Sequence, residues 1–254
     1  MTKYFEILKK EIKHSLYLLI GNCLFRNGVK RVINGESIRF PFEYSRYYPT
    51  DYEVFKQNFI AKHASGNCVD LGAHIGLYTV LMSRKADQVI AFEPTNYTRK
   101  ICEQTIKLNR CNNVRLRSEV VAEQTGQADF YDTGNRVSNA NSLVPVGTPT
   151  QMNSLALDDL CLSIDFLKID IEGAELLALK GARNVLGSLK YMTIEIHPSL
   201  LLKIGQNVEE IFQLLESFEP VYFFQGKVAT PEELSRITEH FEVNIVLNGS
   251  PIQT

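Results

Sequence analysis

The sequence predicts a doubly wound α/β fold, in which helices cover both faces of a mostly parallel sheet. From Asn67 onward, short apolar runs alternate with longer segments of helical periodicity. The first of these runs ends in glycine and shows no inside–outside alternation, which is typical of a strand buried on both faces. Because parallel strands need a crossover between them, this strand–helix alternation favours a parallel sheet.

The expected elements follow this alternation along the chain. The strands cover Cys68–Leu71, Val89–Phe92, Val114–Val121, Phe166–Ile169 and Met192–Ile196. The helices cover Ile75–Ser83, Thr98–Asn109, Ala174–Leu186 and Val208–Ser217. Lesser elements are a short strand at Asp129–Tyr131, a loop at Ser138–Thr150, a helical turn at Leu157–Leu160, and an antiparallel edge pair at Val221–Phe224 and Val243–Leu247.

Composition is that of an ordinary globular protein. The 254 residues carry a formal net charge of -2, and 44% are hydrophobic, so the chain can build a substantial core. The near-neutral charge gives no electrostatic reason to expect a nucleic-acid partner. Five scattered cysteines, none in a C-x-x-C pair, predict reduced thiols in a cytoplasmic protein rather than disulfides or a zinc site.

Residues 1–60 form an expected N-terminal extension, with the main domain at 61–254. The apolar stretch Ser15–Phe25 is shorter than the ~20 residues that span a bilayer, so no transmembrane segment is expected. No small-residue cleavage site follows it. We interpret it as an amphipathic helix that packs on the domain or on a second copy in a homodimer, with peripheral membrane contact as the alternative.

The rest of the extension is rich in aromatic residues. Asn34-Gly35 predicts a turn between two short strands. The aromatic side chains either cap the edge of the main domain or form a lid over the substrate site, and the sequence leaves both open. They are Phe40, Phe42, Tyr44, Tyr47, Tyr48 and Tyr52.

A nucleotide site is predicted where the first main strand ends. Ligands of doubly wound sheets bind beyond the carboxyl ends of the strands, and Asp70, Gly72 and Gly76 occupy such an end. Their D-x-G-x-x-x-G pattern lacks the third glycine of a dinucleotide fingerprint and the G-K-[ST] of a phosphate loop. A carboxylate here would oppose a phosphate, but it favours the sulfonium and amino groups of S-adenosylmethionine.

A second carboxylate supports this cofactor. Glu93, followed by Pro94, ends the second strand 23 positions after Asp70. A carboxylate at about this spacing binds the two hydroxyls of a ribose. His74 in the first turn and Ala122 after the third strand are assigned to the same cofactor site.

The sequence resembles the FkbM-type methyltransferase family. The resemblance rests on VDLGAHIGLYT (69–79), VIAFEP (89–94), KLN (107–109), FLKIDIEGAELLALKGA (166–182) and IEIHP (194–198), and it extends from about Cys68 to Pro220. It implies a Rossmann-like class I methyltransferase fold and O-methylation of sugars, polyketides or other hydroxyl compounds. His74 stands where the family usually has asparagine, and the first sixty residues match no part of the family.

The candidate catalytic residues follow the fourth and fifth strands. Asp170 and Glu172 come after the fourth strand, and Glu195 and His197 end the fifth, so all four are expected beside the cofactor cleft. An alcohol is a weak nucleophile, and clustered carboxylates raise one another's pKa, which suits a general base. The cluster also fits Mg²⁺ as an optional cofactor, although no dedicated metal ligands are assigned. Glu172 and Glu175 alternatively just begin a helix, and His197 alternatively just caps a strand.

The acceptor is expected to be a small molecule or glycan, with Ser142 in contact with it. Two rival functions remain open: a NAD-dependent oxidoreductase, and a catalytically inactive methyltransferase-like binding module. The missing third glycine argues against the first, and the presence of Asp70, Gly72, Glu93 and Asp170 argues against the second.

Overall fold

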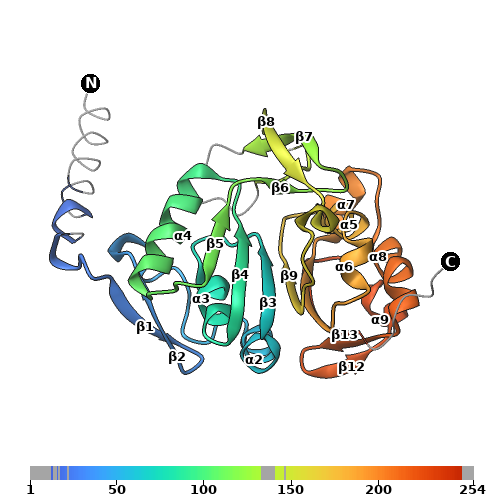
Figure 1. The fold of residues 1–254 in the computed structure, drawn as a ribbon, viewed down its shortest axis with the longest axis horizontal. Helices are drawn as coiled ribbons and strands as arrows, with labels where there is room; N and C mark the ends of the chain where they lie inside the picture. Colours follow the sequence, from blue (N-terminus) through green and yellow to red (C-terminus); the bar gives the residue numbers. More distant parts are fainter. Residues whose placement is uncertain are drawn as a thin grey trace.

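An eight-stranded sheet forms the centre of the molecule (Figure 1). The computed structural model describes residues 13, 16, 18–21, 23–132, 141–145 and 147–247. The strand order is β12-β11-β13-β10-β9-β3-β4-β5. Five neighbouring strands are parallel: β3 (Gly66–Leu71), β4 (Ala86–Phe92), β5 (Val114–Arg117), β9 (Phe166–Ile169) and β10 (Tyr191–Ile196). The predicted doubly wound fold is therefore confirmed.

The other edge of the sheet is antiparallel, as the sequence predicted. Strand β13 (Phe241–Leu247) lies between β10 and β11 (Pro220–Phe224) and runs opposite to both. Tyr222 pairs with Ile245 in this register. The short β12 (Lys227–Ala229) closes the edge as a hairpin with β11.

Strand order reverses between β3 and β9. The chain moves from β3 to β4 and β5 on one side, and later enters β9 and β10 on the other side of β3. Connections leaving such neighbouring strands diverge, which opens a crevice at their carboxyl ends. The functional site is therefore expected at the ends of β3 and β9.

Both faces of the sheet are buried, which explains the continuous apolar runs. Val69 and Leu71 of β3 belong to one buried cluster, whereas Cys68 belongs to the cluster on the opposite face. On the first face pack α5 (Glu175–Lys180), α6 (Arg183–Leu186) and α8 (Val208–Leu215). On the second pack α2 (Val54–His63) and α3 (Leu77–Ser83).

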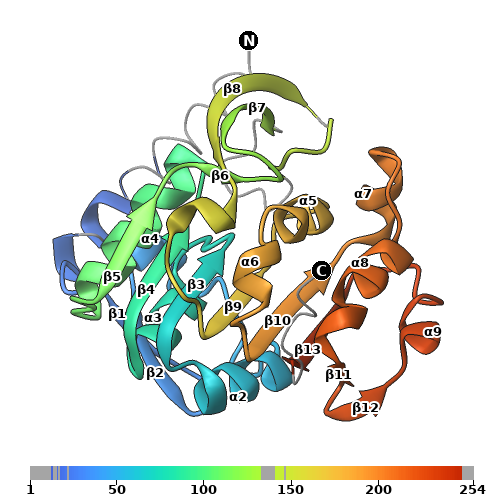
Figure 2. The same cartoon turned by 45° about the vertical axis from the view of Figure 1, so that its right-hand side comes forward.

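The remaining helices lie at the ends of the sheet. In Figures 1 and 2, α4 (Asn96–Leu108) lies beside β4 and β5, whereas α7 (Pro198–Lys203) and α9 (Pro231–Leu234) lie at the opposite end. Three 3₁₀ turns complete the described elements: η1 (Phe42–Tyr44), η2 (Leu157–Leu160) and η3 (Glu216–Phe218). The turn predicted at Leu157–Leu160 is thus confirmed.

Two expected elements are divided in the structure. The predicted strand at Val114–Val121 ends at Arg117, and β6 (Val120–Val121) instead joins a small second sheet with β7 (Gly126–Asp132) and β8 (Thr148–Leu155). The predicted helix at Ala174–Leu186 is interrupted at Gly181, where a Cβ would collide with the carbonyl oxygen of Ala122. Of the predicted loop at 138–150, residues 138–140 and 146 lie outside the described residues.

The N-terminal region packs as part of the main core. The predicted hairpin is confirmed: β1 (Val29–Ile33) pairs with β2 (Glu36–Phe40), and the turn residues Asn34 and Gly35 both have positive φ. Ile38 and Phe40 are buried in the same cluster as α3. Residue 60, the expected end of the extension, lies inside α2.

The apolar stretch at 15–25 is helical at residues 16, 18–21 and 23–24, Phe25 lies in the turn that follows, and residues 15, 17 and 22 lie outside the described residues. Leu16, Leu19 and Leu24 are more than half exposed, so these leucines do not complete the core. Within the described ranges, no helix is long and apolar enough to cross a membrane.

Candidate active site

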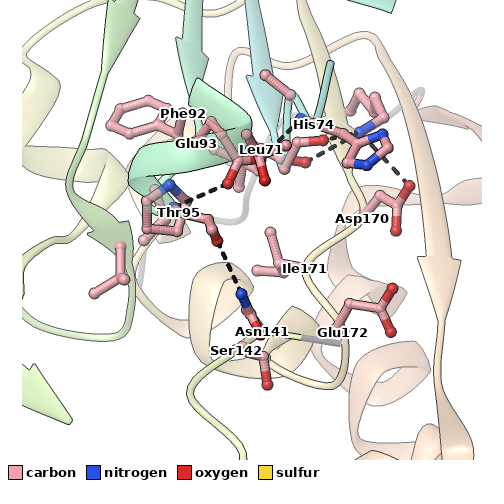
Figure 3. A pocket seen from close by; sticks show the side chains of 18 of the residues that line it. Leu71, His74, Phe92, Glu93, Thr95, Asn141, Ser142, Asp170, Ile171 and Glu172 are labelled. Carbon is pink, nitrogen blue, oxygen red and sulfur yellow. Dashed lines mark hydrogen bonds and ion pairs between the residues drawn. The ribbon is translucent and has the colours of Figure 1, made fainter. Parts of the chain in front are cut away.

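A pocket lies at the carboxyl ends of β3, β4 and β9, where the strand order reverses. Figure 3 shows Glu93 and Thr95 on one side of this pocket and Asp170 and Glu172 on the other. The N-terminal region contributes Tyr48 and Tyr52 to the lining. Other lining residues include Gly72, His74, Pro94, Asn141, Ser142 and Lys168.

The two glycines of the D-x-G-x-x-x-G pattern have different roles. Gly72 lines the pocket with φ 77°, and a Cβ there would collide with the carbonyl oxygen of Asp170. Gly76 does not line the pocket; it has φ 92° and begins α3, and a Cβ there would lie 3.2 Å from Cys102 Sγ on α4. The first glycine therefore lets two backbone segments cross at the pocket floor, and the second lets two helices approach.

Glu93 holds the turn after β3 in place. Its Oε2 accepts a hydrogen bond from the backbone N–H of His74 (2.8 Å), and its Oε1 accepts one from the N–H of Thr95 (2.9 Å). Burial raises the pKa of Glu93 to about 7, although these N–H groups act in the opposite direction. A carboxylate offers about four lone-pair positions, so acceptor capacity remains for a ligand.

Asp70 is buried beneath the pocket rather than facing it. It is fully buried, its Oδ2 accepts from Thr79 Oγ1 at 2.5 Å, and its Oδ1 lies 3.1 Å from Lys168 Nζ. Neither Asp70 nor Ala122 is among the described residues that line the pocket. The structure thus brings Glu93, His74 and Gly72 to the pocket surface but places Asp70 in the layer below.

Lys168, which was not predicted from the sequence, connects Asp70 with the backbone of Gly72 and with Asp170. Its Nζ donates to the carbonyl oxygens of Leu71 (3.2 Å) and Gly72 (3.0 Å), and lies 3.7 Å from Asp170 Oδ2. Burial lowers the pKa of Lys168, but Asp70 and Asp170 more than offset this and raise it overall. A lysine inside the buried strand Phe166–Ile169 was the available sequence signal, because buried lysines are almost always paired.

The predicted catalytic residues do come together. His197 Nδ1 lies 2.8 Å from Glu175 Oε1, and His197 Nε2 lies 3.3 Å from Glu172 Oε2 and 3.9 Å from Glu195 Oε1. One potential ligand atom each from Asp170, Glu172 and His197 lies within 4.8 Å of the others. Of these residues, Asp170 and Glu172 line the pocket.

The side chains of Glu172 and His197 have shifted pKa values. Burial raises the pKa of Glu172 to about 7, against the opposing effect of His197. Burial lowers the pKa of His197, but its contacts with Glu175 and Glu172 more than offset this and raise it to about 9. At neutral pH, His197 is therefore protonated, whereas Glu172 is divided between its two protonation states.

A second missed lysine belongs to the same region. Lys56, on α2, is fully buried, and its Nζ lies 2.6 Å from Glu53, 3.0 Å from Glu195 and 3.6 Å from Glu242. Glu195 thus lies between Lys56 and His197. The N-terminal region therefore supplies a positive charge that holds a carboxylate of β10.

Tyr48 joins the N-terminal region to the turn after β3. Its hydroxyl lies 2.9 Å from His74 Nδ1, and the ring of Tyr47 packs on the His74 ring with centroids 4.9 Å apart. Burial lowers the pKa of His74 to about 4, so its imidazole is neutral at physiological pH. His74, expected to contact the cofactor, is held by the aromatic residues of the extension.

The polar loop at the pocket mouth is placed by backbone pairing. Ser142 exchanges two backbone hydrogen bonds with Tyr131, and its Oγ accepts from the N–H of Val144 at 2.9 Å. Asn141 Nδ2 lies 3.4 Å from Thr95 Oγ1. Ser142 lines the pocket, where a substrate could reach it.

Known proteins resemble part of this chain. A hexuronic acid methyltransferase, AglP, of Haloferax volcanii is 28% identical over 133 residues, which cover 50% of this chain and 54% of that protein. The chain therefore spans about half the length of this relative.

Solved structures are similar at lower identity. An rRNA methylase of Streptococcus thermophilus is 12% identical with a TM-score of 0.47, covering 76% of this chain and 94% of that one. An O-methyltransferase of Bacillus cereus in complex with SAH is 14% identical with a TM-score of 0.41, covering 76% and 79%.

The family profile of the methyltransferase FkbM domain matches residues 70–221. This match includes Glu93, Lys168, Asp170, Glu172 and His197, and it covers more than half of the chain. It supports a transferase over the alternative of a NAD-dependent oxidoreductase. The chain belongs to the FkbM methyltransferase family.

Proposed function

We propose that this protein transfers a methyl group from S-adenosylmethionine to a hydroxyl of a sugar, glycan or polyketide-like acceptor. The observation that carries the proposal is one pocket at the strand-order reversal, which holds Glu93 at one side and the Asp170–Glu172 pair at the other. The first side suits a ribose, and the second suits a group that must lose a proton.

The residues present fit this cofactor. Glu93 retains acceptor capacity for the two ribose hydroxyls, and the bare backbone at Gly72 leaves room for a ligand to approach. Lys168 is already paired with Asp70 and with two carbonyl oxygens, so it is not available to bind a phosphate. The pocket therefore favours a nucleoside without phosphates.

S-adenosylmethionine, when bound, supplies an electrophilic methyl group on a sulfonium centre. Asp170 presents a carboxylate to the pocket and stabilises positive charge there. Lys168 keeps that carboxylate ionised, since Lys168 and Lys56 lower the pKa of Asp170 against the effect of burial. These residues bind and orient the reactants, which is the main contribution a protein makes to a direct displacement.

Glu172 is the proposed general base. It lines the pocket, and its pKa of about 7 allows it to accept the acceptor's hydroxyl proton near neutral pH. His197, already protonated at this pH, does not compete for that proton and stabilises the ionised carboxylate. Glu175 in turn holds His197 through Nδ1.

Tyr52 is proposed to contact the acceptor, and the buried Tyr48, whose ring centroid lies 4.7 Å from that of Tyr52, supports it. Both line the pocket and come from the aromatic N-terminal region. Aromatic rings provide a large apolar surface with a polar edge, which suits the faces of a sugar ring. The similarity to a hexuronic acid methyltransferase supports a sugar as the acceptor.

A divalent cation such as Mg²⁺ is a second means of activating the acceptor. Asp170, Glu172 and His197 could supply one ligand atom each, and the two carboxylates are the ligands that Mg²⁺ prefers. Treatment with EDTA followed by Mg²⁺ distinguishes the two mechanisms. Activity that survives EDTA supports the general base, and activity restored only by Mg²⁺ supports the metal.

The proposal is tested with Glu172→Gln, using Glu209→Gln, an exposed glutamate on α8 outside this pocket, as the matched control. We expect Glu172→Gln to bind SAH with unchanged affinity in calorimetry and to lose about 10²–10⁴-fold in turnover of a sugar acceptor. Turnover within a few-fold of the parent would place the base elsewhere. Binding of SAH without turnover of any acceptor by the parent would favour a catalytically inactive binding module.

A further inference from the structure

The N-terminal helical segment presents an apolar face to solvent. Leu16, Leu19, Ile20 and Leu24 are 54%, 68%, 50% and 72% exposed. Their spacing of three and four residues places them on one side of a helix, together with the exposed Cys23. Apolar side chains gathered on one face mark an interaction surface, whereas single exposed ones do not.

The other side of this segment is fixed to the protein. Gly21 is buried, and a Cβ there would collide with the ring of Phe42. The ring of Phe25 stacks on Phe42 with a centroid distance of 5.3 Å and an interplanar angle of 2°. In Figure 1, the blue helical segment lies at the edge of the molecule, beyond β1 and β2. Because the opposite side of the helix packs on Phe42, the apolar face points away from the protein.

The charged residues within this segment and the strand that follows it are all basic. Residues 12–35 contain no Asp or Glu, although the whole chain has a net charge of -2. Lys13 at one end of the face and Arg26 and Lys30 at the other are exposed. An apolar helical stripe flanked by cations complements a surface of anionic lipid headgroups, into which leucines insert while lysines and arginines reach the phosphates.

We propose that this helical face docks the protein on an anionic membrane surface. A second copy of the chain fits the face less well, because a symmetric contact would bring Lys13, Arg26 and Lys30 close to the same cations of the other copy. The segment would lie in the plane of the interface rather than cross the bilayer.

The test is sedimentation of the full chain with vesicles of phosphatidylcholine alone or mixed with phosphatidylglycerol. Leu19→Glu/Leu24→Glu removes the apolar insertion, and Leu202→Glu/Val228→Glu is the matched control, since those side chains are 67% and 70% exposed elsewhere. Arg26→Gln/Lys30→Gln removes two of the cations. All six substituted side chains are exposed. Equal melting temperatures of parent and variants confirm that the variants fold.

We expect the parent to bind the mixed vesicles. The Leu19/Leu24 variant should lose at least tenfold in vesicle affinity, and its control should lose none. Removing each cation should weaken binding about fivefold. No preference of the parent for anionic vesicles would overturn the proposal, as would equal binding by the Leu19/Leu24 variant. If the parent is a dimer in sedimentation velocity, the Leu19/Leu24 variant is a monomer and the parent does not bind vesicles, the face is the contact with a second copy.

Discussion

Asp70→Asn should lower the stability of the protein much more than its affinity for the cofactor. The carboxylate of Asp70 is fully buried, lies 3.1 Å from Lys168 Nζ and accepts a hydrogen bond from Thr79. Asparagine keeps the size of the side chain but removes the negative charge. Among the described residues, Asp170, 3.7 Å away, is then the one remaining ionic partner of the buried Lys168.

Breaking a buried ion pair from one side costs about 3–5 kcal/mol. For a chain of this length, each kcal/mol corresponds to a fall in melting temperature of about 2–4 °C, so the variant should melt roughly 6–20 °C below the parent. Urea unfolding measures the free energy, and calorimetry with SAH measures the affinity. Glu93→Gln is the control, because Glu93 reaches the pocket. An unchanged melting temperature with a tenfold loss of SAH affinity in Asp70→Asn would refute this reasoning.

The affinity of the parent for SAH should rise between about pH 6 and 8, because the Glu93 pKa of about 7 makes this carboxylate ionise in that range and an ionised carboxylate binds hydroxyl groups more strongly. In Glu93→Gln the affinity measured by calorimetry should be lower by about 1.5–3 kcal/mol at high pH and independent of pH. The same rise of affinity with pH in the variant would contradict this. Lys56→Met should lower the free energy of unfolding in urea by about 3–5 kcal/mol at pH 8 and by less near pH 5. The reason is that burial raises the pKa of Glu242 to about 7, and this side chain needs no counterion when it is protonated. An equal loss of stability at both pH values would disprove the role of the charge. Gly72→Ala should lower the melting temperature far more than Gly35→Ala, because both glycines have positive φ but only Gly72 lacks space for a Cβ, and similar losses would show that backbone strain alone decides.

The sheet was predictable where strands are buried on both faces. Cys68–Leu71, Val89–Phe92 and Phe166–Ile169 all lie within observed strands, because such strands have continuous apolar sequences. Strand β8 (Thr148–Leu155) was missed, since most of its side chains are exposed and polar and give no apolar period. Pairing with β7 rather than local sequence makes it a strand.

The pocket was predictable from strand ends, but the direction of each side chain was not. Val69 and Leu71 face one buried layer, so Asp70 between them points to the opposite layer, under α3, where Thr79 and Lys168 contact it. Alternation along the strand contained this information once the strand's length was known. The prediction that Asp70 binds the cofactor remains untested, and its burial favours an indirect role.

The contribution of the N-terminal region could not be predicted from local patterns. Lys56 and Tyr48 carry no motif, and their partners lie on β10 and in the turn after β3. Only the tertiary fold brings a lysine on α2 to Glu195, 139 positions later in the chain.

The ion pairs of Lys56 also bear on how the protein folds. Two of them join α2 to Glu195 on β10 and to Glu242 on β13, which lie 139 and 242 − 56 = 186 positions later in the chain, whereas the pair with Glu53 is local. Closing loops of this length is entropically unfavourable until other native contacts exist. We therefore expect these contacts to be absent from the folding transition state, so that Lys56→Met accelerates unfolding and leaves the refolding rate nearly unchanged. The ion pairs beside the candidate active site would then also determine how long the native state persists.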